Sequence, residues 1–444
     1  MRIFTRQFGL RGLASCSVAL VGLLTLFPLL ALAQTQLNVD QAGRLYPIAI
    51  PVQCSSSSDA NSVAKEIPEV LAKDLDLSGY FKVMEPSSFI ETPGKCGGPD
   101  QFAFTDWSVL GTDLLVKGDI DVDGDSLSAK LYLYDVIGKQ MVLGKSYNGS
   151  VSQARKIAHR FANEIMRYLT GIPGVFGTQL VFSGKVGRFK ELFVVDMDGS
   201  NLKQITNDYG LNLSSSWSPD GQKIIYTGYK NRVPDLFVYN IGSKRSTQLT
   251  KGVAMELGSK YAKDGSTIVF SRTYGRDADI VLGTESGQEL KRLARDNGAI
   301  DVSPDFSPDQ SQIVFVSNRA GGPQIYVMGS DGSNVRRVSY VGSNYCTSPT
   351  WSPRGDKLAF VCRADAGHQL FVSNVDGTQP LQLTTVGSNE DPTWSPDGRY
   401  IIFASTLGRG VFNLALIRED GSNFRQITNM RVGATDPAWG PLVD

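Results

Sequence analysis

From residue 179 to the end of the chain, short apolar runs alternate with clusters of Gly, Asp, Ser and Pro. Residues 400–403 and 413–417 show the pattern, with turn-forming glycines between them at 408 and 410. A third run, 424–428, follows the Asp-Gly pair at 420–421. Apolar runs of this length, bounded by turn residues, predict short β-strands. With the residues before Trp394, one such unit contains four strands.

A turn motif of the form Trp-Ser-Pro-Asp-Gly recurs through this region. Full or degenerate copies begin at Trp217, Tyr261, Phe306, Trp351 and Trp394, and a clipped copy begins at Trp439. Successive copies are 43 to 45 residues apart. A repeat of this length with four short strands is typical of a propeller blade. Because the motif recurs from repeat to repeat, we interpret it as a hairpin turn whose aromatic side chain is wedged between neighbouring blades, not as a binding site.

The third strand of the repeat gives an independent count of the blades. It starts at Leu192, Leu236, Ile280, Ile325, Leu370 and Leu414, which predicts six blades. The first blade has no motif ahead of it, whereas the copy at Trp439 has no blade behind it. We therefore predict an all-β six-bladed β-propeller over residues 175–444, in which the C-terminal strand becomes the inner strand of the first blade and closes the ring.

Residues 34–170 lack the repeat and show helical as well as strand periodicity. A helix is predicted over 61–75, with Val63, Ile67, Val70 and Leu71 on one face and Pro68 inside it. Strands are predicted at 81–84, 114–116 and 131–134. A second helix, capped by Ser152, extends through Leu169 with apolar residues at a spacing of four, namely Ile157, Phe161, Ile165 and Leu169. Helices mixed with strands predict a small α/β domain, which the breaker at 171–174 separates from the propeller.

An acidic segment in this domain imitates the start of an EF-hand loop through Asp119, Asp121, Asp123, Gly124 and Asp125. Position twelve of that loop, where a bidentate acid is needed, is Lys130, and the flanking segments are strands where helices are required. We therefore predict a β-hairpin that turns at Asp123-Gly124 and no metal site.

The first 33 residues have the features of a secretory signal peptide. A basic start precedes the apolar stretch 18–32, and Ala31-Leu32-Ala33 provides small residues for cleavage before Gln34. The stretch is short and contains Pro28, which argues against a permanent membrane span. A lipobox-like Cys16 lies before the apolar stretch, where a lipidated cysteine should follow it. Cleavage after Ala33 would leave residues 34–45 as a flexible N-terminal segment of the exported chain.

Charge and cysteine content narrow the possible partners and the compartment. The chain has 44 basic and 44 acidic residues, so neither nucleic acid nor an anionic membrane is an expected partner. After the signal peptide, four cysteines remain, and an even number in an exported chain favours disulfides over free or metal-binding thiols. Cys346 and Cys362 are equidistant from the turn at 352–356, which predicts a cross-strand bridge and leaves Cys54 with Cys96 by elimination.

Three further segments carry a resemblance to a known family. They are Asp-Leu-Asp-Leu-Ser-Gly-Tyr-Phe at 74–81, Trp-Ser-Val-Leu-Gly-Thr-Asp at 107–113 and Leu-Thr-Gly-Ile-Pro-Gly at 169–174. With the signal peptide, the α/β domain and the propeller, they make nearly all of residues 34–444 resemble the TolB family, periplasmic components of the Tol–Pal system. The resemblance implies a protein that binds other proteins, without catalysis and without a cofactor.

The resemblance also implies partners and places them. In the family, the propeller binds the outer-membrane lipoprotein Pal, and the first residues of the mature chain bind the C-terminal domain of TolA. Other outer-membrane proteins and colicin-type bacteriocins are further implied partners, and outer-membrane integrity and cell division are the implied roles. The corresponding TolA-binding residues in this sequence are Gln34, Thr35, Gln36, Leu37, Asn38, Val39 and Asp40.

The resemblance places Pal on the loops that lead into the inner strands, here 211–216, 255–260, 298–305, 343–350, 388–393 and 433–438. Family positions that contact Pal correspond to Met255, Gly258, Val302 and Ser303. Asp391 and Asp436 precede proline in two of these loops, and we expect them at the mouth of the central channel.

Two enzyme classes are the alternatives. Propellers with this motif also precede α/β-hydrolase domains, but no Gly-x-Ser-x-Gly nucleophile elbow occurs. A propeller polysaccharide lyase would require a cluster of His and Arg in the channel, and the chain has only His159 and His368. The same shortage of histidine argues against a zinc site.

Overall fold

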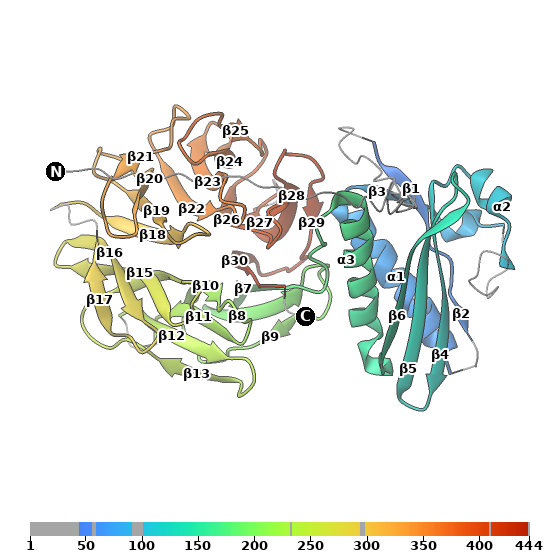
Figure 1. The fold of residues 1–444 in the computed structure, drawn as a ribbon. Coiled ribbons are helices and arrows are strands. Elements are labelled where there is room, and N and C mark those ends of the chain that lie inside the picture. Colours follow the sequence, from blue (N-terminus) through green and yellow to red (C-terminus); the bar gives the residue numbers. More distant parts are fainter. Residues whose placement is uncertain are drawn as a thin grey trace, which may run out of the picture. The chain divides into compact units, whose positions relative to one another are not determined.

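The structure is a computed structural model that describes residues 44–55, 59–90, 101–230, 233–293, 298–407 and 410–442. The predicted signal peptide, the segment 34–43 and Cys96 lie outside the described residues. The described part contains an α/β domain followed by a six-bladed propeller (Figure 1), which confirms the predicted fold class. No described helix is long and apolar enough to cross a membrane.

The α/β domain is built on a six-stranded sheet with the order β3-β1-β4-β5-β6, in which β2 also pairs with β4. Strand β1 pairs in parallel with β3 and β4, whereas β4, β5 and β6 form an antiparallel meander. The strands are β1 (Tyr46–Ala49), β2 (Cys54–Ser55), β3 (Phe81–Val83), β4 (Leu114–Asp123), β5 (Ser126–Asp135) and β6 (Gln140–Ser150). The short helical turns are η1 (Pro86–Ser88), α2 (Phe104–Ser108) and η3 (Val151–Gln153).

Two long helices, α1 (Asn61–Ser78) and α3 (Ala154–Thr170), lie between this sheet and the propeller (Figure 1). Helix α1 buries the predicted apolar face and contains Pro68. It continues three residues beyond the predicted end, to Ser78, and the next residue, Gly79, has a φ of 70° that allows the left-handed C-cap. Helix α3 buries Ile157, Phe161, Ile165 and Leu169, as predicted.

The predicted cap of the second helix was wrong. Ser152 lies inside the turn η3, and Ser150 forms a capping box with Gln153 at the start of that turn. The side chain of Gln153 reaches back to the backbone N–H of Ser150 at 3.0 Å. A glutamine three residues after a serine is the signal for such a box, and it outweighs the position of Ser152 next to the helix.

The acidic segment forms the predicted hairpin. Strand β4 ends at Asp123 and β5 begins at Ser126, and these two residues are paired across the turn. Gly124 takes a φ of 57°, which a tight hairpin turn requires. No group of three or more His, Cys, Asp or Glu side chains in the described part of the chain is arranged to hold a metal ion.

Each blade of the propeller is a four-stranded antiparallel sheet. Blade 1 contains β7 (Gln179–Val186), β8 (Phe189–Asp196), β9 (Lys203–Gln204) and β30 (Ala434–Trp439). Blade 2 contains β10 (Asn212–Trp217), β11 (Lys223–Gly228), β12 (Asp235–Asn240) and β13 (Arg245–Gln248), and blade 3 contains β14 (Glu256–Tyr261), β15 (Thr267–Tyr274), β16 (Asp277–Thr284) and β17 (Glu289–Arg292).

The remaining blades repeat the arrangement. Blade 4 contains β18 (Asp301–Phe306), β19 (Gln312–Ser317), β20 (Gln324–Gly329) and β21 (Arg336–Arg337). Blade 5 contains β22 (Cys346–Trp351), β23 (Lys357–Ala364), β24 (Gly367–Asn374) and β25 (Leu381–Gln382), and blade 6 contains β26 (Asn389–Trp394), β27 (Tyr400–Ser405), β28 (Asn413–Arg418) and β29 (Arg425–Gln426). The six predicted third-strand residues each lie in the third strand of one blade.

The ring closes as predicted. Strand β30 pairs with β7, with Trp439 opposite Leu180, so the last strand of the chain is the inner strand of blade 1. Two of the motif tryptophans join neighbouring blades by a hydrogen bond: the indole N–H of Trp217 donates to the carbonyl of Ala438 at 3.3 Å, and that of Trp394 to the carbonyl of Thr350 at 3.4 Å. These buried contacts confirm the structural interpretation of the motif.

The predicted bridge in blade 5 is present. Cys346 and Cys362 are paired across β22 and β23, and their sulfur atoms are 2.05 Å apart. Cys54 is also disulfide-bonded. Its predicted partner, Cys96, lies outside the described residues, so the second pairing stays a prediction.

Candidate functional site

The propeller has two faces with different contents. Because the strands of a blade are antiparallel, the motif turns (218–222, 262–266, 307–311, 352–356 and 395–399) all lie at one end of the blades; we call this end the motif face. The described parts of the connections between blades (205–211, 249–255, 298–300, 338–345, 383–388 and 427–433) lie at the other end, where the inner strands begin; we call it the entry face.

Every inner strand contains a β-bulge three residues before its motif aromatic. The strand register shifts there, and the bulged residue has a φ between 49° and 62°. The six residues are Ser214, Gly258, Ser303, Ser348, Asp391 and Asp436. A bulge redirects side chains locally, and here all six residues line one cavity of about 100 Å³ in the central channel.

Four of the six predicted Pal-contact residues therefore come together in the channel: Gly258, Ser303, Asp391 and Asp436. Their predicted position in loops was wrong, because pairing with the second strand resumes after each bulge and makes these segments part of the inner strands. Met255 lies on the entry face just before β14 and is 44% exposed. Val302 is half-buried, packs against the apolar core of blades 4 and 5, and is not among the residues that line the channel cavity.

The channel has an acidic sector where blades 5, 6 and 1 meet. Ser348 Oγ donates to the Asp391 carboxylate at 3.0 Å, and Thr435 Oγ1 donates to Asp436 at 2.8 Å. The Lys190 ammonium lies 3.8 Å from Asp436. Burial, followed by the negative charge of Asp436, raises the pKa of Asp391 well above its ordinary value. A carboxyl group with so perturbed a pKa in a concave site is a common mark of function.

Around the channel, every connection between blades exposes a large apolar side chain. The exposed fractions run from 44% to 97%. The residues are Tyr209, Val253, Met255, Ile300, Tyr340, Val386 and Val432, which we call the apolar rim. Single exposed apolar residues are ordinary, but a set on one face around a concave centre is typical of a protein-binding surface. Of the apolar rim, the sequence analysis identified only Met255. The signal for the other six residues is a single apolar residue in a connection that is otherwise rich in Gly, Ser and Asn.

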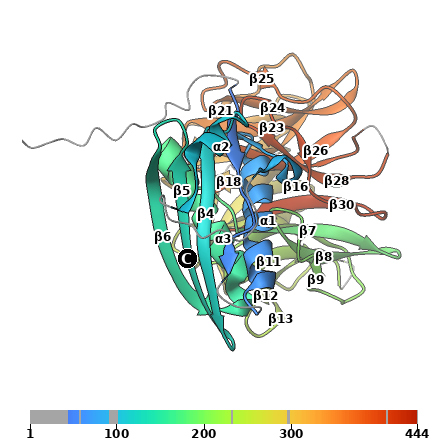
Figure 2. The same cartoon turned by 90° about the vertical axis from the view of Figure 1, so that its right-hand side faces the viewer.

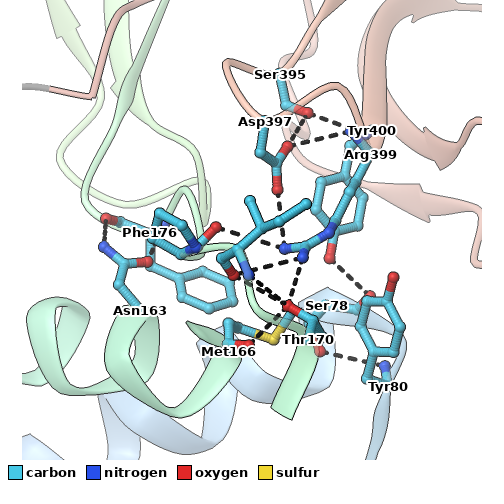
Figure 3. Close-up of polar contacts among 12 residues, drawn as sticks. Ser78, Tyr80, Asn163, Met166, Thr170, Phe176, Ser395, Asp397, Arg399 and Tyr400 are labelled. Atoms are coloured by element: carbon cyan, nitrogen blue, oxygen red, sulfur yellow. Dashed lines mark hydrogen bonds and ion pairs between the residues drawn. The ribbon is translucent and has the colours of Figure 1, made fainter. Parts of the chain in front are cut away.

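The motif face of blades 6 and 1 is occupied by the α/β domain. Arg399, in the motif turn of blade 6, lies against the end of α3 and the following linker (Figure 3). Its guanidinium donates to Thr170 Oγ1 and to the carbonyl oxygens of Ile172 and Pro173, and it pairs with Asp397 at 3.3 Å. The Tyr400 hydroxyl donates to the carbonyl of Ser78 at 2.9 Å (Figure 3).

Further contacts extend this junction on both sides. The Asn423 amide donates to the carbonyl of Leu77 at 2.8 Å. In blade 1, Asp198 pairs with Arg155 at 3.0 Å and with Lys73 at 3.4 Å. One apolar core runs from the sheet through α1 and α3 into blades 1 and 6. Sequence reasoning missed this junction, although Arg399-Tyr400 departs from the other repeats, which have Gln222, Ser266, Ser311 and Asp356 at the position of Arg399.

The two histidines are far apart in the fold and each contacts a carboxylate. His159 Nδ1 lies 2.6 Å from Asp74 between α3 and α1, and His368 Nδ1 lies 2.9 Å from Glu390 in the propeller. Neither makes a hydrogen bond to a Ser, Thr or Cys side chain among the described residues. A nucleophile activated by a histidine needs such a contact, so this arrangement gives no support to the hydrolase alternative.

Comparison with protein-family models gives two matches that together cover most of the chain. The TolB amino-terminal domain matches residues 36–142, and the TolB beta propeller domain matches residues 166–443. The second match alone covers more than half of the chain.

Individual relatives agree with these models. The Tol-Pal system protein TolB of Roseobacter denitrificans is 35% identical over 215 residues, which is 46% of this chain and 48% of the relative. That of Geobacter metallireducens is 37% identical over 166 residues, or 37% of this chain and 38% of the relative. The chain thus matches about half or less of the length of these relatives. The crystal structure of TolB from Acinetobacter baumannii shares the fold, with a TM-score of 0.77 over 90% of this chain and 97% of that chain, at 24% identity.

Proposed function

Because the chain belongs to the TolB family, whose curated members are named Tol-Pal system proteins, we propose that it is a non-catalytic binding component of this system in the periplasm. In this proposal the entry face of the propeller binds the lipoprotein Pal, and the segment that follows the signal peptide binds the C-terminal domain of TolA. The protein then supports outer-membrane integrity and cell division through these two contacts.

The observation that carries the proposal is the composition of the entry face. An apolar rim surrounds a channel lined by serine and aspartate, which matches the apolar and polar contents of a specific protein interface. The rim residues lie on connections that the rigid blades hold in place, so little conformational entropy is lost when a partner binds. The opposite face is already occupied in blades 6 and 1 by the α/β domain.

The proposed TolA-binding residues, Gln34 to Asp40, lie outside the described residues. The first described residue, Arg44, is held beside the sheet by an ion pair with Asp113 at 2.9 Å. The proposed TolA-binding residues precede this ion pair in the chain. Deletion of 34–43 is therefore expected to abolish TolA binding and to leave the unfolding temperature unchanged; a truncated protein that still binds TolA would refute this part of the proposal.

A charge-reversal experiment tests the proposed Pal surface. The paired change Asp391→Lys and Asp436→Lys is expected to weaken binding of purified Pal by at least about tenfold in calorimetric titration, because it reverses the charge of the acidic sector. The matched control is Asp123→Lys with Asp125→Lys in the β4–β5 hairpin, which should leave the affinity unchanged. Equal effects of the two pairs would show that Pal binds elsewhere. Circular dichroism must confirm that both variants are folded.

A further inference from the structure

A second cavity, separate from the channel, lies beside α3 in the α/β domain. It has a volume of about 300 Å³, which is within the range of small-ligand sites. Strand β6, at the edge of the sheet, forms one wall, helix α3 forms the second, and residues 173–177 and Leu442 complete it. We call this cavity the α3 pocket. None of the residues that we propose for Pal or TolA lines it.

The α3 pocket is strongly cationic. Lys145 comes from β6, and Lys156, Arg160 and Arg167 come from one side of α3, since residues three and four apart share a helix face. Glu164 is the single acid in the lining. It lies 3.0 Å from Lys145 and 3.6 Å from Arg167, so it offsets one positive charge and leaves an excess of about three.

Two of these cations have no partner of their own in the described part of the chain. Lys156 and Arg160 make no hydrogen bond and no ion pair with any described residue, although both line the α3 pocket. All four cations are exposed residues on the walls of the α3 pocket. Like charges gathered around one pocket repel one another, and the repulsion is relieved when an anion binds between them. The cations at the junction between the α/β domain and the propeller differ, because Arg399 and Arg155 are neutralised by Asp397 and Asp198.

A buried hydroxyl group adds directional chemistry to this charge. The Tyr147 hydroxyl lines the α3 pocket, is shielded from solvent, and makes no hydrogen bond with the described residues. Burial raises the pKa of Tyr147 to about 12, so the group stays a neutral donor at physiological pH. A buried hydroxyl without a partner is costly, and an oxygen acceptor in the cavity removes that cost.

From the cation cluster, the unpaired donor and the size of the cavity, we propose that the α3 pocket binds a small anion carrying two or more carboxylate or phosphate groups. Arg160 would bind one anionic group in a forked arrangement, since a guanidinium presents parallel N–H donors. Lys156 would act as a mobile point charge, and the Tyr147 hydroxyl would donate to a remaining oxygen. The ion pairs of Lys145 and Arg167 with Glu164 would hold the walls in place.

Calorimetric titration of the full mature chain with citrate, pyrophosphate or sodium chloride at matched ionic strength tests this site. We expect 1:1 binding of citrate, of pyrophosphate or of both, and no saturable binding of chloride. Citrate alone would identify a carboxylate ligand and pyrophosphate alone a phosphate ligand. Binding of both would identify a site selective for charge only. Absence of saturable binding by either polyanion would overturn the proposal.

Variants place the binding in the α3 pocket. Arg160→Ala is expected to weaken the affinity roughly tenfold or more, the usual loss for one charge-assisted contact, and Tyr147→Phe a fewfold. Lys65→Ala, which removes an exposed cation from α1, is the matched control and should have no effect. An equal loss for Lys65→Ala, or no loss for Arg160→Ala, would refute the assignment. Because these side chains make no internal hydrogen bonds, the variants should fold, and Pal binding should be unchanged in all of them.

Discussion

The two faces of the propeller shift the pKa values of their aspartate side chains in opposite directions. On the motif face, hydrogen bonds from Ser307 and Ser311 lower the pKa of Asp309 to about 2, and those from Ser218 and Gln222 lower that of Asp220. On the entry face, burial and Asp436 raise the pKa of Asp391. The fold stabilises the charged forms of Asp309 and Asp220 on the motif face, whereas it disfavours the charged form of Asp391 in the channel. Groups that folding disfavours are commonly kept for function.

The repeated motif is not uniform in its role either. In blades 2 to 5 its polar residues complete the turn of their own hairpin. In blade 6 the same turn also anchors the α/β domain through Arg399 and Tyr400. The view turned by 90° shows α1 and α3 in front of the blades (Figure 2). The propeller therefore uses the motif face for its own assembly, which leaves the entry face for the partners that we propose.

The largest expected effect is on the motif face. Arg399→Ala removes the cation that joins α3, the linker and Asp397, and leaves the buried Asp397 carboxylate without its ion pair. We expect a loss of about 3 kcal/mol in the free energy of unfolding and faster proteolysis at residues 171–174. Urea denaturation and limited proteolysis measure both. Gln222→Ala, the same repeat position in blade 2, is the control. An equal loss there would mean that the position serves each blade and not the junction.

The next effect is on the apolar rim. The double change Tyr340→Asp and Val386→Asp puts charge where an apolar contact is proposed, and each buried apolar anchor contributes about 1 to 2 kcal/mol to binding. We expect roughly thirtyfold weaker Pal binding in surface plasmon resonance and unchanged stability. Val109→Asp, which alters an apolar side chain that is 81% exposed in the α/β domain, should not change the affinity. If it weakens binding as much, the rim is not the interface.

The smallest expected effects are on stability, and they compare Asp391 in the channel with Asp309 on the motif face. Because the folded-state pKa of Asp391 is raised, its ionised form costs stability that grows as pH rises above about 4. Asp391→Asn is therefore expected to match the wild type at pH 4 and to be more stable by about 1 kcal/mol or more at pH 8, the equivalent of one pKa unit. Urea denaturation at several pH values measures the difference.

Asp309→Asn is the counterpart with the opposite sign. The folded-state pKa of Asp309 is about 2, so its ionised form adds stability that is present above pH 4 and disappears as pH falls toward 2. The asparagine variant should be slightly less stable at neutral pH and equal to the wild type in acid. The same pH dependence for both variants would contradict the contrast between the two faces.

The fold could be predicted because its signals are local. The turn motif, the apolar runs and the third-strand residues recur along the propeller. Once the strands of one repeat are correctly assigned, the strands of all six blades follow. The pairing of Cys346 with Cys362 followed from the same turn, since register across a hairpin is fixed by the turn residues. The last copy of the motif, at Trp439, has no blade after it, and this predicted how the ring closes.

The candidate site was harder to predict, because it depends on backbone conformations that its residue types do not indicate. Ser303, Ser348 and Asp391 take left-handed backbone angles at the bulges, which non-glycine residues rarely do. The bulge brings Gly258, Ser303, Asp391 and Asp436 into one channel, although the sequence suggested loops. The burial of Val302 and the junction role of Arg399 depend on contacts between blades and between domains. The sequence marks Arg399 only as a departure from the other repeats and does not show what it contacts.

The central claim is that partners bind the entry face and not the motif face. Hydrogen–deuterium exchange of the mature protein, with and without saturating Pal, tests it most directly. The account predicts slower exchange in the connections between blades, 205–211, 249–255, 338–345, 383–388 and 427–433, and unchanged exchange in the motif turns. Protection confined to the motif turns or to the α/β domain, with the entry face unchanged, would contradict it.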